Sequence, residues 1–68
     1  MTITVLVNGS PQDLQSPLEL ATLVAEFSKA PTGVAAALNE TVVPRSRWSA
    51  TVLADGDRVE ILTAVQGG

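Results

Sequence analysis

The stretch that decides the fold is residues 2–9, TITVLVNG, in which a strand pattern runs directly into a turn sequence. Alternate residues from Ile3 to Val7 are β-branched and apolar, which predicts a strand with one buried face. Asn8-Gly9 follows at once, and this pair favours a tight hairpin because both residues tolerate a positive φ. We therefore expect a return strand over residues 12–15, with Leu14 pointing inward.

A helix is predicted next along the chain. Ser16-Pro17-Leu18-Glu19 has the form of a capping box, with the proline at the first helical position. Four apolar residues then follow at the spacing i, i+3, i+4, i+7, namely Leu20, Leu23, Val24 and Phe27. This spacing predicts an apolar stripe on one helix face. Because Pro31 and Gly33 oppose continuation, the helix should end near Ser28 or Lys29.

The second half of the chain reads as further strands. Residues 34–38 and 41–43 are short apolar runs on either side of Asn39-Glu40, and residues 58–64 are expected to form a last strand. In that last strand Val59 and Ile61 should point inward. Residues 44–48 have no regular pattern and are expected to be irregular.

The predicted order is strand, strand, helix, strand, short strand, strand. A single apolar helix stripe must pack on one face of one sheet, and the mostly hydrophobic first strand is expected to be central. The helix permits a crossover that places the last strand parallel to the first. We expect an α+β protein of the β-grasp type, with a mixed sheet of four to five strands, over residues 1–64, followed by a tail over residues 65–68.

Composition narrows the function. The 68 residues suffice for one small domain, and with 46% hydrophobic and 3% aromatic residues its core is aliphatic and leaves no room for a deep catalytic cleft. The absence of cysteine and histidine excludes disulfides, thiolate metal sites, cysteine nucleophiles and the usual general base. The acidic residues do not have the spacing of a calcium loop. A carrier or binding module without metal or bound cofactor is expected, not an enzyme.

Charge and hydropathy patterning address location and partners. The formal net charge is -3, with Lys29, Arg45, Arg47 and Arg58 as the cationic side chains, so there is no basic stripe for nucleic acid. No segment approaches the ~18 apolar residues of a membrane span, and the first 28 residues lack the Lys or Arg of a signal-peptide n-region. We expect a cytoplasmic protein that binds neither nucleic acid nor membranes and meets a partner with basic residues.

A family resemblance covers nearly the whole chain. It is carried by residues 37–39 (ALN), 42–45 (VVPR) with Trp48 three residues on, 55–61 (DGDRVEI) and 63–68 (TAVQGG), together with the first strand and Asn8. In this order and length they resemble ubiquitin-like β-grasp proteins that end in Gly-Gly, and most of all the thiamin-biosynthesis sulfur carriers. Asn39-Glu40 departs from the permissive Asn-Gly turn that members often carry, which could strain or lengthen the turn.

The resemblance implies a function for the chain end. A ubiquitin-activating-type enzyme would use ATP to adenylate the carboxylate of Gly68, and a sulfur donor such as a cysteine desulfurase would supply the sulfur of a thiocarboxylate. Thiazole synthase would then take that sulfur. Gly67, Gln66 and Val65 would thread into the active sites of these partners. The protein would be a cosubstrate of these enzymes and would not itself catalyse a reaction.

Three other functions are compatible with the same fold. The chain could resemble the small subunit of molybdopterin synthase, it could be a ubiquitin-like modifier that forms isopeptide bonds, or it could be an interaction module with an inert tail. The amino-acid sequence of residues 63–66 and the stretch from Pro44-Arg45 to Trp48 favour the thiamin carrier.

Other residues have simpler interpretations. Trp48 is expected to cover the edge of the core, with a partner contact as the alternative. Arg45 and Arg47 are expected to form surface pairs with Asp55 or Glu60, with steering of a partner as the alternative. Two turns complete the predictions: Asp55-Gly56-Asp57 is expected to be a turn and no metal site, and Asn8-Gly9 a hairpin turn and nothing more.

Overall fold

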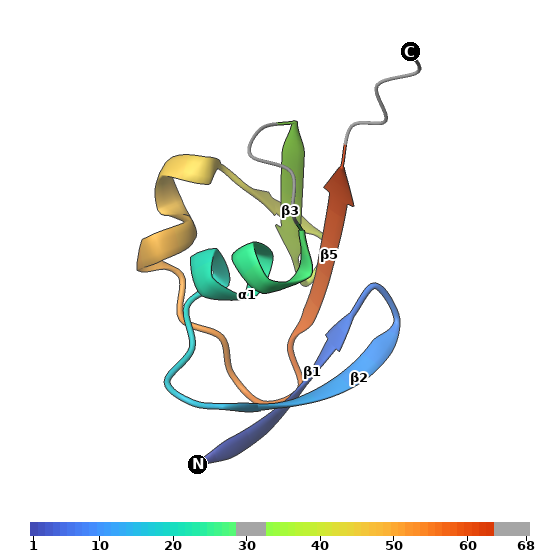
Figure 1. The fold of residues 1–68 in the computed structure, drawn as a ribbon, viewed down its shortest axis with the longest axis vertical. Coiled ribbons are helices and arrows are strands. Elements are labelled where there is room, and N and C mark those ends of the chain that lie inside the picture. The colour runs from blue at the N-terminus through green and yellow to red at the C-terminus, as the bar shows by residue number, and fades with distance from the viewer. Residues whose placement is uncertain (29–32, 64–68) are drawn as a thin grey trace.

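The computed structural model describes residues 1–28 and 33–63, and this part of the chain forms a mixed sheet of five strands with one α-helix (Figure 1). The elements in chain order are β1 (Thr2–Val7), β2 (Ser10–Gln15), α1 (Leu20–Phe27), β3 (Val34–Leu38), β4 (Thr41–Val43), the 3-10 helix η1 (Arg45–Ala50) and β5 (Arg58–Thr63). The predicted α+β arrangement of the β-grasp type is confirmed.

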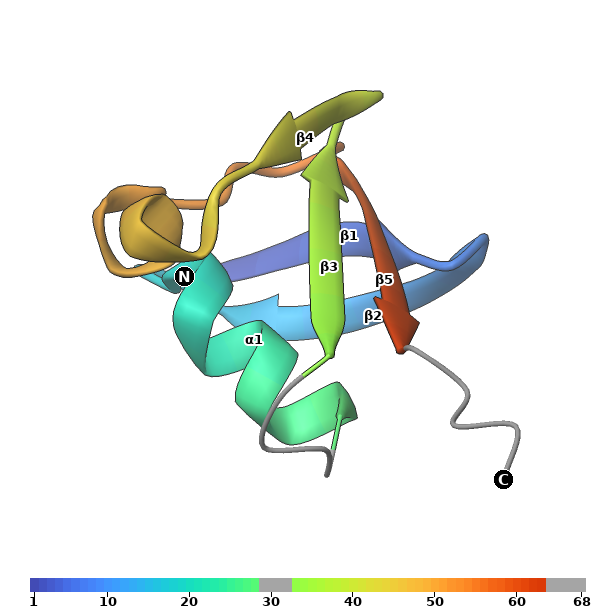
Figure 2. The ribbon, with the colours of Figure 1, turned by 90° about the horizontal axis from the view of Figure 1, so that it is seen from above.

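The sheet has the strand order β2-β1-β5-β3-β4. β1 is antiparallel to β2 and parallel to β5, while β3 is antiparallel to both β4 and β5. The predicted parallel pairing of the first and last strands is therefore confirmed. β1 has a neighbour on each side, as expected, but β5 occupies the middle of the sheet. Figure 2 shows α1 lying across one face of this sheet.

The core lies between that sheet face and the two helices. The strand residues that point into it come from β1 and β5 at alternate positions, because successive side chains of a strand point to opposite faces. The buried hydrophobic residues are Ile3, Val5, Val7, Leu20, Leu23, Val24, Ala36, Trp48, Leu53, Val59 and Ile61. Leu14 on β2 is partly buried and packs against this cluster, as predicted. The core is aliphatic apart from Trp48.

The predicted capping box is wrong, and α1 begins later than expected. Its N-cap residue is Glu19, and no side chain caps the helix. The preceding residues are extended: the Leu20 amide donates to the Thr51 carbonyl oxygen and the Leu53 amide donates to the Leu18 carbonyl oxygen, both at 2.8 Å. This pairing keeps Leu18 and Glu19 out of helical conformation, so a contact more than 30 residues away along the sequence overrides the local capping signal.

The apolar stripe of α1 is also shorter than predicted. Leu20 and Leu23 are fully buried, but Phe27 is 44% exposed. Phe27 is the last residue of the helix, and at 1.5 Å per residue it lies about 10 Å further along the helix axis than Leu20. At that distance the core no longer covers the ring.

The segment predicted to be irregular is the 3-10 helix η1. Trp48 anchors it: the indole is 7% exposed, and its Nε1–H donates to the Val43 carbonyl oxygen at 2.8 Å. The expectation that Trp48 covers the core is confirmed. A 3-10 helix has no apolar periodicity as clear as that of an α-helix, so sequence pattern misses it.

Within the described ranges, no helix is long and apolar enough to cross a membrane.

Candidate functional site

The predicted site lies at the chain end, beyond the described residues. Val65, Gln66, Gly67 and Gly68 all fall in the range 64–68. The structure does describe the strand that leads to them, since β5 runs to Thr63. What the structure shows of the site is therefore how β5, the strand that precedes it, is held in place.

β5 is held on both sides by neighbouring strands. On one side β1 pairs with its first half, through Leu6↔Arg58 and Val7↔Val59. On the other side the whole of β3 pairs with β5, from Leu38↔Val59 to Val34↔Thr63. Val59 and Ile61 anchor the strand in the core with 1% and 7% exposure, as predicted. The chain thus reaches Thr63 on a strand that is fixed in position by backbone pairing and by burial.

Asn8 extends the hold on β5 beyond the end of β1. Its amide donates to the Val59 carbonyl oxygen at 2.9 Å. Its side chain then bonds both backbone groups of Ile61: Nδ2 donates to the carbonyl oxygen at 3.1 Å, and Oδ1 accepts from the amide at 2.8 Å. Asn8 (φ 51°) and Gly9 (φ 85°) do form the predicted turn. The expectation that they do nothing more is wrong, because Asn8 also pairs with β5.

Asn39 holds the beginning of β5 from the opposite side. Its amide donates to the Arg58 carbonyl oxygen at 2.7 Å, and its Oδ1 accepts from the Arg58 amide at 2.9 Å. Its Nδ2 donates to Asp57 Oδ1 at 3.0 Å. Sequence reasoning missed both asparagines as β5 contacts, because an asparagine in a turn has no pattern that points to a distant strand.

The Asn39-Glu40 turn is not lengthened, contrary to one of the two expectations. Leu38 pairs directly with Thr41, so two residues connect β3 and β4. Both have positive φ, 49° at Asn39 and 72° at Glu40. A positive φ is unfavourable for a residue with a Cβ, so the expected strain falls on Glu40. The Glu40 carboxylate accepts from Arg58 Nη1 at 3.4 Å.

Asp55-Gly56-Asp57 is a turn, as predicted, and its two carboxylates hold the loop before β5 in place. Asp55 Oδ1 accepts from the Thr4 amide at 2.7 Å, and Asp57 Oδ2 accepts from the Ala54 amide at 2.8 Å. Both carboxylates thus accept from backbone amides, and Asp57 also accepts from the Asn39 side chain. Among the described residues there is no group of three or more Asp, Glu, His or Cys side chains that could hold a metal ion.

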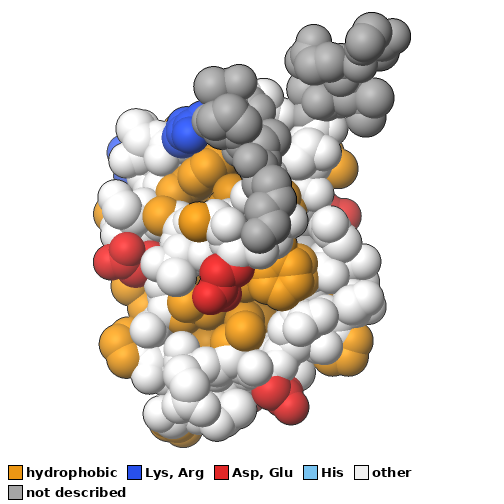
Figure 3. Space-filling view, viewed as in Figure 1, with side chains coloured by type: hydrophobic (Ala, Val, Ile, Leu, Met, Phe, Trp, Pro, Cys, Tyr) orange, Lys and Arg blue, Asp and Glu red, His pale blue; other side chains and the backbone are white. Residues whose placement is uncertain are grey.

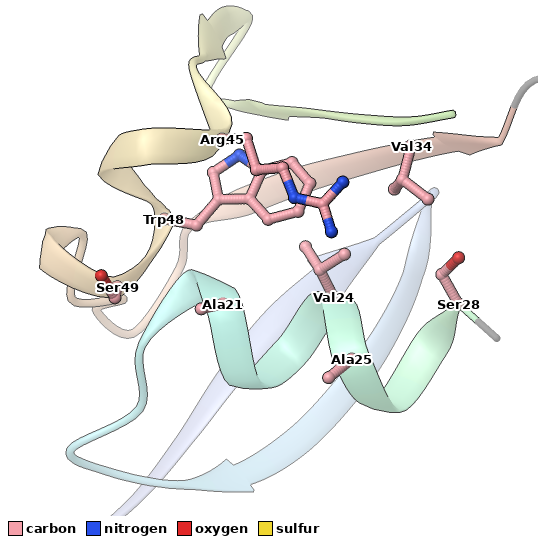
Figure 4. A pocket seen from close by; sticks show the side chains of 8 residues that line it. All are labelled: Ala21, Val24, Ala25, Ser28, Val34, Arg45, Trp48 and Ser49. Atoms are coloured by element: carbon pink, nitrogen blue, oxygen red, sulfur yellow. The ribbon is translucent and has the colours of Figure 1, made fainter. Parts of the chain in front are cut away.

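A groove of about 400 Å³ lies between α1, η1 and the start of β3. Trp48 forms part of its wall, and the Arg45 guanidinium lies 5.5 Å from the centre of the Trp48 ring (Figure 4). The expected pairs of Arg45 or Arg47 with Asp55 or Glu60 are not among the ion pairs of the described residues. Among the described residues that line the groove, the polar ones include Ser28, Arg45 and Ser49.

Apolar side chains are also exposed on the molecule. Leu62 on β5 is 67% exposed and Val42 on β4 is 71% exposed. Leu62 alternates with the buried Val59 and Ile61, so it points away from α1. On the side that carries α1, Figure 3 shows hydrophobic side chains at the surface next to acidic ones. These exposed apolar side chains offer surfaces for contact with other molecules.

Comparison with known proteins identifies the family of this chain. The family model described as the ThiS family matches residues 5–68. The chain is 33% identical over 66 residues to the uncharacterized protein ycf40 of Porphyra purpurea, covering 97% of this chain and 93% of that protein. It is 25% identical over 64 residues to the sulfur carrier protein ThiS of Escherichia coli K12, covering 94% of this chain and 97% of that protein.

A solved structure has the same fold. The crystal structure of the thiamine biosynthesis protein ThiS from Geobacter metallireducens superposes with a TM-score of 0.78 at 32% sequence identity, covering 97% of this chain and 100% of that chain. The region matched by the family model, residues 5–68, includes β5 and the two glycines at the chain end. The chain belongs to the ThiS family.

Proposed function

We propose that the protein is a sulfur carrier for the thiazole branch of thiamin biosynthesis, and that the carboxylate of Gly68 carries the sulfur. The observation that supports this most is the family match over residues 5–68, which extends through Gly67-Gly68. The named relative from Escherichia coli is a sulfur carrier and the one from Geobacter metallireducens a thiamine biosynthesis protein. Both names favour this function over that of a ubiquitin-like modifier or of a molybdopterin-synthase subunit.

The chemistry needs activation of the terminal carboxylate. A carboxylate is ionised at neutral pH and is a poor electrophile. Attack of its oxygen on the α-phosphate of ATP releases pyrophosphate and forms an acyl-adenylate. The terminal sulfur of a persulfide on a donor such as a cysteine desulfurase then attacks the carbonyl carbon and AMP leaves, which forms an acyl disulfide with the donor. A second thiol, on a partner enzyme or a small reductant, attacks the donor sulfur of this disulfide, forms a new disulfide with it and releases the terminus as a thiocarboxylate. ATP is a substrate of the partner enzyme and no cofactor resides on the carrier.

The division between body and chain end suits this chemistry. Val65, Gln66, Gly67 and Gly68 can span at most roughly 13–14 Å when extended, which is enough to bring the carboxylate into a partner's active site. The two glycines lack a Cβ, so the segment next to the nucleotide stays narrow. The body, whose β5 ends at Thr63, would act as the handle that a ubiquitin-activating-type enzyme and thiazole synthase grip, in the cytoplasm.

The decisive test is intact-mass analysis after incubation with ATP, a sulfur donor and the cognate adenylating enzyme. The full-length protein should gain the mass of one oxygen replaced by sulfur, and fragmentation should map this change to Gly68. Deletion of Gly68 should abolish loading and leave the melting curve unchanged, because the core of the described residues is built from side chains between Ile3 and Ile61. A full-length protein that never accepts sulfur, or a truncated protein that does, would refute the proposal.

A further inference from the structure

The end of β5 is completed by a side chain where a neighbouring strand is missing. The parallel ladder between β1 and β5 ends with Val7↔Val59, because the positive φ of Asn8 turns the chain away into the hairpin. The next backbone groups on this side of β5 belong to Ile61. Their partners are the two side-chain atoms of Asn8, at 2.8 Å and 3.1 Å.

An asparagine side chain is well suited to this task. Its amide offers one carbonyl oxygen and an NH₂ group, so it can satisfy the amide and the carbonyl of one residue as a strand backbone would. Without it the Ile61 groups would have no strand partner on the β1 side. Ile61 stands two residues before Thr63, where β5 ends. Among the described residues, Asn8 thus makes the last hydrogen bonds on the β1 side of β5 before the segment that carries Gly67-Gly68.

We propose that Asn8 is a positioning residue for the reaction at Gly68, acting through Ile61 to fix the place and direction in which the chain leaves the sheet. This inference rests on the proposed function. An adenylating enzyme must grip the body and receive the terminus at the same time. If the end of β5 is loosened, fewer molecules present the terminus in the competent arrangement, and the apparent affinity falls by that fraction.

Asn39 provides a matched control. It is also an asparagine with positive φ in a two-residue turn, at 49° against 51° for Asn8. It also bonds β5 through its side chain, but at Arg58, the first residue of the strand. Asn8→Gly removes two side-chain hydrogen bonds, both to Ile61, and Asn39→Gly also removes two, one to the Arg58 amide and one to the Asp57 carboxylate. Both variants keep a residue that tolerates the turn. They differ in which end of β5 is released.

The first measurement is amide hydrogen exchange by NMR. Asn8→Gly should raise the exchange rate of the Ile61 amide about tenfold, while Asn39→Gly should raise that of Arg58 and leave Ile61 unchanged. The second measurement is steady-state adenylation, followed as pyrophosphate release at saturating ATP and at a temperature where both variants are fully folded. Asn8→Gly should raise the KM for the carrier about three- to tenfold with kcat unchanged, and Asn39→Gly should leave KM within about twofold.

A second variant tests whether the effect of Asn8→Gly comes from the lost hydrogen bonds or only from the loss of side-chain volume. Asn8→Asp keeps the oxygen that accepts from the Ile61 amide, but it puts a second carboxylate oxygen where Nδ2 donates to the Ile61 carbonyl oxygen. Because these two oxygens repel each other, Asn8→Asp should raise KM at least as much as Asn8→Gly. The proposal is overturned if the KM of Asn8→Gly equals that of the wild type, or if Asn39→Gly raises KM equally. If the wild-type protein itself is not adenylated, the proposed function fails and the positioning role falls with it.

Discussion

The two hairpin turns of this protein have the same backbone shape and different sequences. Asn8-Gly9 joins β1 to β2 and Asn39-Glu40 joins β3 to β4, and all four residues have positive φ. In the first turn glycine adopts φ 85° with no atom within 4 Å of the position of a Cβ. In the second, glutamate adopts φ 72°. The residues of Asn8-Gly9 themselves favour its conformation, and we call it the permissive turn. Asn39-Glu40 is held in the same conformation by contacts with neighbouring residues, and we call it the imposed turn.

The surroundings of the second turn are the beginning of β5. Asn39 makes three hydrogen bonds there, to both backbone groups of Arg58 and to the Asp57 carboxylate, and Glu40 pairs with the Arg58 guanidinium. Each neutral hydrogen bond contributes about 0.5–1.5 kcal/mol net, which together exceeds the ~1–2 kcal/mol cost of a left-handed residue with a Cβ. A difficult turn can therefore persist where a central strand holds it.

The largest effect should come from removing the strand on which both turns depend. Val59→Asp would bury an unpaired carboxylate at a position with 1% exposure, at a cost of more than about 3 kcal/mol. We expect the cooperative thermal transition to be lost, as monitored by circular dichroism.

A control on the same strand isolates burial as the cause. Leu62→Asp introduces the same side chain at a position with 67% exposure, so cooperative melting should be retained. Cooperative melting of Val59→Asp would show that the assigned facing of β5 is incorrect.

The next effect should come from the permissive turn. Gly9→Ala would place a Cβ at φ 85°. The left-handed strain of about 1–2 kcal/mol is only partly offset by the lower unfolded-state entropy of alanine, about 0.5–1 kcal/mol. Urea unfolding should show a loss of about 1 kcal/mol in the free energy of unfolding. No change in the urea midpoint would mean that the turn relaxes to another geometry.

The mirror substitution in the imposed turn should have the opposite sign. Glu40→Gly relieves the strain at φ 72°, which raises the free energy of unfolding. The larger conformational entropy of glycine in the unfolded state offsets part of this gain, so the net rise should be about 0.5 kcal/mol. A higher melting temperature in differential scanning calorimetry is the expected result. Destabilisation by this substitution would contradict the assignment of strain to Glu40.

The smallest effect should come from the ion pair of the imposed turn. Glu40→Gln keeps the backbone and removes the charge that faces Arg58, whose side chain is 54% exposed against 76% for Glu40. Because exposed pairs are screened by solvent, the change should stay below about 0.5 kcal/mol and vanish in high salt. A larger loss in urea titrations would assign the stability of the turn to charge instead of to the Asn39 hydrogen bonds.

Much of the fold follows from local patterns. The alternation from Ile3 to Val7 places the buried face of β1, and the apolar runs at 34–38 and 41–43 have the observed bounds of β3 and β4. Val59 and Ile61 are buried as their spacing predicts. These predictions succeed because the facing of a strand depends on residues that are neighbours in sequence, as do the φ angles of the Asn8-Gly9 turn.

The amino-acid sequence by itself determined the order of the elements, the facing of the strands and a glycine pair after the last strand. Tertiary structure decided three features: the start of α1 at Leu20, the 3-10 helix around Trp48, and the grip of Asn8 on Ile61. Each depends on a hydrogen bond to a partner outside the element itself, and that between Asn8 and Ile61 joins residues 53 positions apart. Such contacts exist only after the chain has closed its loops, so no local pattern announces them.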